Sequence, residues 1–149
     1  MRRLAAFVAL PPGDRRLLLE ALSALAAVRV ALRFVAVERV RAWAGRVTPG
    51  TRPVDKIVWA VGVVSRQLPG TTCLKSALAL QRLLSRHGHV SELHIGVARE
   101  DEKFSAHAWL TCEGRILVGE LEHDRFTRLV AWKAVGLPGT TVAAKSDPA

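Results

Sequence analysis

The sequence contains no tyrosine, a single methionine and only two cysteines, Cys73 and Cys112. A small secreted domain held together by disulfides would carry more cysteine, so we expect reduced thiols and a cytoplasmic protein. Acidic residues are also scarce, because 13 Asp and Glu stand against 22 Lys and Arg. The absence of low-complexity tracts and internal repeats excludes disordered and repeat architectures.

Other absences narrow the function. Charged residues break the longest apolar stretch, Leu17–Val37, so it does not predict a membrane span. The apolar N-terminus resembles a signal peptide only faintly, because it lacks a small-x-small cleavage site. No glycine-rich phosphate loop is present, and we expect no cofactor. The histidines lack zinc-site spacing, so they are interpreted as helix-end and loop residues rather than metal ligands; they are His87, His89, His94 and His123.

What is present predicts one globular domain. Half of the 149 residues are hydrophobic and 23% are charged, which is typical of a globular protein. A chain of this length can bury a hydrophobic core without a disulfide or a bound metal ion. Residues 1–66 carry 12 basic and four acidic residues, and so hold most of the net charge of +9. This asymmetry suits an acidic peptide, a partner protein, a membrane surface or nucleic acid, although a solvated helix face would explain it equally well. We divide the domain into a basic helical part, about 1–50, and a Cys–His core, about 51–135.

The first half of the chain has the period of helices. Pro11–Asp14 predicts a turn with Asp14 as helix cap, followed by a helix from Arg15 to about Trp43. This stretch is longer than an average helix, so we expect it to divide near residues 33–36. A further helix is predicted from Pro53 to Gln67. Another runs from Cys73 to about His87, with Gly88 as the left-handed residue that ends it.

After Gly88 the apolar period changes to two, which indicates strands. Strands are predicted at Leu93–Val97, at Phe104–Cys112 and from Arg115 to about Gly119, with a tight turn at residues 113–114 and a short closing element beyond residue 120. Glu-Gly is a weaker hairpin turn than Asn-Gly, because glutamate resists a positive φ. Helices followed by a small antiparallel sheet predict an α+β fold.

Cys73 is the first candidate for chemistry. It lies in the first turn of its predicted helix, after Thr71 and Thr72, either of which could cap the helix. Unpaired backbone N–H groups and the positive end of the helix dipole favour a thiolate there, which is the reactive form of cysteine. The alternative is that Cys73 is a small buried side chain of the hydrophobic core, as free cysteines commonly are.

His107 is the second candidate. A polar imidazole is unusual in the middle of a strand of small apolar residues, so we interpret it as a functional group. The alternative is a core histidine satisfied by one hydrogen bond. Alternation places it on one face with Ser105, Trp109 and Thr111. If the hairpin turns at residues 113–114, Trp109 faces Val118 and His107 faces Glu120, with Cβ atoms about 5 Å apart.

Glu120 could therefore hold the imidazole in its useful tautomer, as the third group of a catalytic triad does. A slip of one residue would place Glu120 on the wrong face. Asp124 and Asp101 are its substitutes. Gln67, six residues before the cysteine, is a candidate for binding the oxyanion; a glutamine that simply ends an exposed helix is the alternative.

Two segments resemble a known family. The run from Thr72 to Gly88, TCLKSALALQRLLSRHG, is similar to the nucleophile helix of the lasso-peptide leader peptidases, the bacterial B-type maturation proteins of the transglutaminase-like, papain-like superfamily. The run FSAHAWL, residues 104–110, followed by Glu113–Arg115, resembles that family's histidine strand and hairpin. The residues between them and Arg125–Leu129 are also similar. The resemblance covers roughly residues 13–132.

The resemblance implies a thiol protease with Cys73 as nucleophile and His107 as base. The third member in the family is usually Asp at the end of the next strand, where this chain has Glu120. Such proteins remove the leader from a ribosomally synthesised precursor peptide, often with Thr at the penultimate leader position. It further implies a separate small leader-binding protein and an asparagine-synthetase-like lasso cyclase as partners in antibiotic biosynthesis.

Two other functions use the same residues differently. A transglutaminase-like acyltransferase would pass the acyl group to an amine instead of water. A non-catalytic binding module would use the basic helices on a membrane or nucleic acid and leave Cys73 inert. We expect no nucleic-acid partner, and peripheral contact with a membrane stays open.

Overall fold

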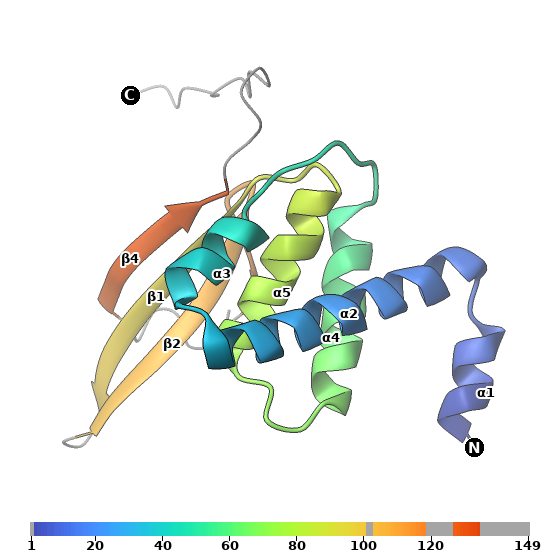
Figure 1. The fold of residues 1–149 in the computed structure, drawn as a ribbon, viewed down its shortest axis with the longest axis horizontal. Coiled ribbons are helices and arrows are strands. Elements are labelled where there is room, and N and C mark those ends of the chain that lie inside the picture. The colour runs from blue at the N-terminus through green and yellow to red at the C-terminus, as the bar shows by residue number, and fades with distance from the viewer. Residues whose placement is uncertain (1, 101–102, 119–126, 135–149) are drawn as a thin grey trace.

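The computed structural model describes residues 2–100, 103–118 and 127–134. Figure 1 shows helices gathered on one side of a four-stranded antiparallel sheet, with α2 running across α4 and α5. The α+β fold predicted from the sequence is confirmed. The elements are α1 (Arg2–Ala9), α2 (Pro12–Phe34), α3 (Val37–Ala44), α4 (Val54–Gln67), α5 (Cys73–Arg86), β1 (Ser91–Glu100), β2 (Lys103–Cys112), β3 (Arg115–Val118) and β4 (Thr127–Lys133).

Helix α5 forms the centre of the molecule, because it packs on the sheet with one side and on α2, α3 and α4 with the others. Most of its side chains are buried, as expected of a helix covered all round. Helix α2 buries a single stripe at spacings of three and four residues, which also belongs to this core. The stripe comprises Leu17, Leu18, Ala21, Ala24, Leu25 and Val28.

The helix boundaries follow the sequence signals with one correction. The long apolar stretch divides as predicted, because α2 ends at Phe34 and α3 begins at Val37. Asp14, however, does not cap α2. The helix already begins at Pro12, whose fixed φ suits a first helical position, and the carboxylate of Asp14 accepts a hydrogen bond from Lys56 Nζ at 2.9 Å.

The sheet has the order β3-β2-β1-β4, so the predicted closing element lies beside β1 at the opposite edge from β3. The tight turn is confirmed: Glu113 (φ 51°) and Gly114 (φ 77°) both have the positive φ of a primed hairpin turn, and Cys112 pairs with Arg115. The predicted pairing of Trp109 with Val118 is wrong. A bulge between Leu110 and Thr111 shifts the register, so Val118 faces Leu110.

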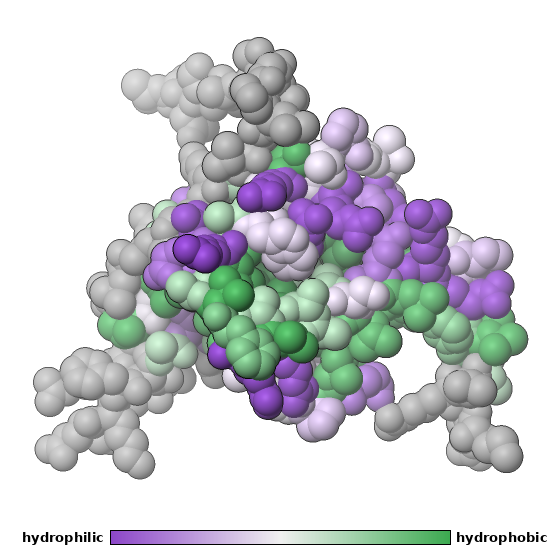
Figure 2. Space-filling view, viewed as in Figure 1, coloured by the Kyte–Doolittle hydropathy of each residue, from purple (hydrophilic) through white to green (hydrophobic). Residues whose placement is uncertain are grey.

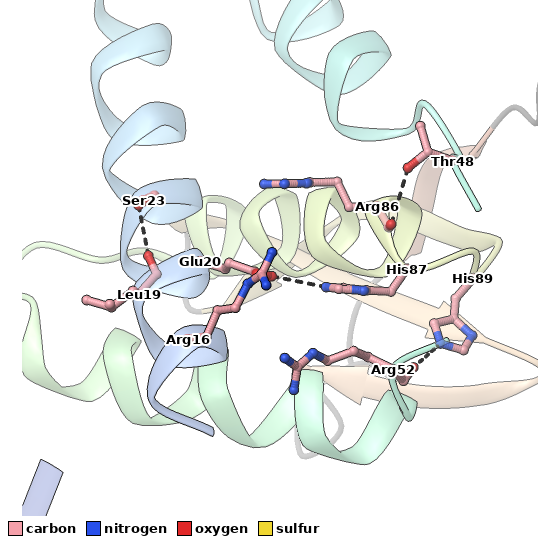
Figure 3. Close-up of polar contacts among 9 residues, drawn as sticks. All are labelled: Arg16, Leu19, Glu20, Ser23, Thr48, Arg52, Arg86, His87 and His89. Atoms are coloured by element: carbon pink, nitrogen blue, oxygen red, sulfur yellow. Dashed lines mark hydrogen bonds and ion pairs between the residues drawn. The ribbon is translucent and has the colours of Figure 1, made fainter. Parts of the chain in front are cut away.

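Polar contacts join α2, the end of α5 and the segment before α4 (Figure 3). His87 Nε2 lies 3.1 Å from Glu20 Oε2, and His89 Nε2 lies 2.6 Å from the carbonyl oxygen of Arg52. Burial raises the pKa of Glu20, but the hydrogen bonds with His87 and Arg16 and the neighbouring charges together lower it by more than burial raises it. The pKa of Glu20 is therefore below its ordinary value. These two histidines therefore hold the fold together at the helix end.

A close backbone contact fixes the loop between α3 and α4. A Cβ atom at Gly50 would lie 2.4 Å from the Cα of His87, which is closer than real Cβ atoms approach. Its neighbour across the contact, Gly88, has φ +86° and ends α5, as predicted. Thr48 adds two hydrogen bonds to the same helix end, from its backbone N to Ser85 and from its hydroxyl to Arg86.

We expect Gly50→Ala to lower the free energy of unfolding by about 1–3 kcal/mol, because backbone atoms must move to make room for the methyl group. Gly62→Ala is the matched control, since a Cβ there would meet only the flexible end of Arg66, at 3.4 Å. In helix α4 that change should be neutral or stabilising. Urea denaturation of both variants measures the difference, and equal stability would contradict the contact.

Candidate functional site

Cys73 is the first residue of α5. Thr72, with an extended backbone (φ −96°, ψ 165°), is its N-cap, and the Thr72 hydroxyl accepts a hydrogen bond from the backbone N of Lys75 at 3.4 Å. The cysteine is a free thiol, partly buried, and packs against the core between helices and sheet. The sequence prediction of a cysteine at a capped helix N-terminus is therefore confirmed in its geometry.

The loop before Cys73 is fixed from three directions. Thr71 Oγ1 donates to the carbonyl of Leu68 at 2.8 Å, and Lys75 Nζ donates to that of Gly70 at 2.8 Å. Arg29 Nη1 donates from α2 to the carbonyl of Pro69 at 2.7 Å. A loop held in this way keeps the first turn of α5, and with it the thiol, in one position, as a reacting group requires.

His107 lies in β2, which contacts α5. Its ring is partly buried and stacks on Trp109, with centroids 6.4 Å apart and planes at 21°. Trp109 in turn stacks on His94 of β1, at 5.4 Å and 10°. Ala108 and Leu110 alternate to the opposite face and lie in the core shared with the helices.

This arrangement corrects one assumption behind the Cys–His pair. Alternation along β2 assigned His107 and Trp109 to one face, and the structure agrees. It could not tell which face the helices cover, and the burial of Ala108 and Leu110 in the shared core shows that they cover the other one. Helix α5 and strand β2 are in contact, whereas the pairing of Cys73 with His107 stays a prediction.

The third member of the triad also stays a prediction. Glu120, Asp124 and Asp101 all lie outside the described residues. Glu120 would face His107 only if the register ran unbroken from the turn, and the bulge between Leu110 and Thr111 breaks it.

Gln67 ends α4, as predicted, but it lines a groove between α1, α2 and α4 that Cys73 does not line. The oxyanion role therefore stays a prediction. The backbone N–H of Cys73, at the start of a helix, is the donor that its position makes available.

A crevice of about 450 Å³ begins one helical turn from Cys73, where Ser76 of α5 faces α4 and β3. Ser76 Oγ lies 3.1 Å from Ser65 Oγ, and both serines line the crevice together with Arg66, Leu117 and Val118. Its serines occur at ordinary helix positions, so no motif in the sequence pointed to it. It is the candidate binding cleft on the helix-covered side of the sheet.

Cys112 differs sharply from Cys73. It is 3% exposed, and its Sγ donates to the carbonyl of Val90 at 3.4 Å. Burial raises the pKa of the Cys112 thiol, the charge of Glu113 raises it further, and Arg115 opposes this. Cys112 is therefore protonated at neutral pH and fits a structural thiol.

We expect iodoacetamide to label Cys73 first in the native protein at pH 7, because only a thiolate that the reagent can reach reacts quickly. Labelling of Cys112 should appear only as the pH rises well above the usual thiol range or the protein unfolds, since its pKa is raised. Peptide mapping by mass spectrometry after timed quenching distinguishes the two sites. Equal rates for both cysteines in the native protein would contradict the burial of Cys112.

The fold agrees with the comparison with known families. Residues 16–131 match the family model described as Transglutaminase-like superfamily. The chain belongs to the transglutaminase-like superfamily. This superfamily includes cysteine peptidases and acyltransferases, and its members are usually catalytic cysteine enzymes. No curated protein and no solved structure matches the chain.

The transglutaminase-like match spans α2 to β4 and so includes both Cys73 and His107. It leaves α1 outside. None of the described helices is long and apolar enough to cross a membrane.

Proposed function

We propose that the chain is a cysteine peptidase that removes the leader from a lasso-peptide precursor. The observation that carries this proposal is the half-buried thiol of Cys73 at the capped start of α5, within the transglutaminase-like match. Its fixed loop and the neighbouring crevice support a site that positions an extended peptide against the sulfur.

In the proposed reaction, His107 takes the proton of the thiol, and Cys73 Sγ attacks the carbonyl carbon of the last leader residue. The backbone N–H of Cys73 donates to the oxyanion that forms. The C–N bond then breaks, and His107 returns the proton to the departing amine of the core peptide. Water hydrolyses the thioester and frees the leader carboxylate. The mechanism requires a hydrogen bond between the imidazole and the thiol, and another base must take this role if His107 stays on the face of β2 opposite the helix-facing residues.

The proposed partners follow from the same assignment. A precursor peptide would be delivered by a separate small leader-binding protein, and an asparagine-synthetase-like cyclase would receive the freed amine. A cytoplasmic location fits two reduced thiols and these partners.

Mass spectrometry of the products tests the reaction. The protein is incubated with a lasso-peptide precursor and a leader-binding protein that binds this precursor. A leader ending in a carboxylate supports hydrolysis, whereas a new amide between leader and an added amine means that the chain is an acyltransferase. Intact precursor over the same period, with partners shown to bind, would contradict both.

A non-catalytic binding module is the second candidate. It is favoured by one observation, namely that His107 stacks on Trp109 on the face of β2 opposite to the helix-facing Ala108 and Leu110. A binding module predicts that Cys73→Ala binds its partner as well as the wild type does.

A further inference from the structure

Helix α2 is apolar on two sides. One side forms the core, and the other is turned to solvent although it also carries large hydrophobic side chains. Leu19 is 53% exposed, Leu22 41%, Val30 57% and Phe34 82%. With the exposed Ala26 they follow one another at three- and four-residue steps, so they form a stripe about 22 Å long. We call these five residues the α2 face.

Two hollows flank the α2 face. One, of about 520 Å³, lies between α1, α2 and α4 and is lined almost entirely by apolar side chains, among them Phe7, Leu22 and Trp59. The other, of about 310 Å³, lies between α2 and α3 next to Trp43. Figure 2 shows a hydrophobic band along this side of the molecule, where α2 crosses the view, bordered by hydrophilic residues. A patch of this kind marks an interaction site.

The charge around the α2 face is positive. The acidic residues of α2 are neutralised within the fold: Lys56 binds Asp14 at 2.9 Å, and Arg16 binds Glu20 at 3.1 Å. By contrast, Arg33 near the end of α2 is exposed, and Arg29 donates to a carbonyl rather than to a carboxylate. The exposed Arg39 lines the hollow beside α3. An occupant of this surface should therefore be acidic.

We propose that the α2 face binds an acidic partner protein, which lays an amphipathic helix with acidic flanks along it. A straight apolar stripe with hollows on both sides accepts the projecting side chains of a helix, as ridges pack into grooves. A second copy of the chain is disfavoured, because each copy carries a net charge of +9. A bilayer surface would cover the stripe but could not fill the hollows. The proposal does not depend on catalysis.

The experiment uses the full chain and a fluorescein-labelled synthetic helix of about 20 residues, with leucine on one face and glutamate on both flanks. Fluorescence anisotropy should show saturable binding that weakens with salt. Val30→Gln and Leu22→Gln should each weaken it about tenfold or more, because they place an amide in the apolar contact. Val8→Gln is the matched control, since Val8 is 62% exposed but outside the α2 face, and it should change binding less than about twofold.

Circular dichroism should show that all three variants remain folded, as expected for exposed positions. Equal binding by the wild type and Val30→Gln, or equal binding of a peptide with lysine in place of glutamate, would overturn the proposal. So would binding to vesicles of phosphatidylcholine and phosphatidylglycerol without binding to the helix, if Val30→Gln abolished it. A concentration-dependent dimer in sedimentation, lost in Val30→Gln, would assign the surface to self-association instead.

Discussion

Cys73→Ala should abolish release of the leader, with a loss in kcat of about 10⁴-fold or more, because no other group can form the thioester. The fold should survive, since the side chain is only partly buried and α5 keeps its Thr72 cap. Cleavage of the precursor, followed by mass spectrometry in the presence of the leader-binding protein, measures the loss.

Cys112→Ala is the control for that experiment. It removes the other thiol, which is buried against Val90, and should reduce stability while leaving kcat nearly unchanged. A Cys73→Ala protein that cleaved at the wild-type rate would rule out covalent catalysis and leave the binding module as the better description.

His107→Ala should lower kcat by about 10³-fold, because the thiol would lose the group that removes its proton and later protonates the amine. Imidazole added to the buffer should restore part of the activity, which a merely structural role would not produce. KM should change little, because the histidine acts on the reacting bond rather than on the rest of the peptide.

His94→Ala is the matched control, since His94 lies in the same aromatic stack and its Nε2 is 3.0 Å from Thr111 Oγ1. His94→Ala should destabilise the sheet, and added imidazole should not raise its kcat. If His107→Ala kept full kcat while Cys73→Ala lost it, a base other than His107 would serve the thiol. That result would agree with the stacking of His107 on Trp109, on the face of β2 opposite the helix-facing residues.

The sequence predicted most of the fold because its signals are local. The 3.6-residue period and the glycine after α5 gave helix boundaries close to the observed ones, although α2 begins at Pro12 instead of the predicted Arg15. The hairpin at residues 113–114 was also predicted, although glutamate is a poor residue for a positive φ. Each of these features is decided by neighbouring residues.

The features that were missed depend on distant parts of the chain. The bulge at Leu110 is a property of two strands together, so counting from the turn could not reveal it. In the same way, alternation along β2 shows which residues share a face but not which face meets α5. The position of Cys73 was predictable because a helix start is local, whereas its relation to His107 was not.

Arg29 gives the surface of α2 a thermodynamic connection to the thiol. Arg29 precedes Val30 of the α2 face in the sequence, and its guanidinium donates to the carbonyl of Pro69, four residues before Cys73. An acidic group that drew this guanidinium away would cost the loop one hydrogen bond, and one that left it in place would reinforce the loop. Linkage makes such an effect reciprocal, so whatever a bound helix does to the affinity for peptide at Cys73, the peptide must do to the affinity for the helix.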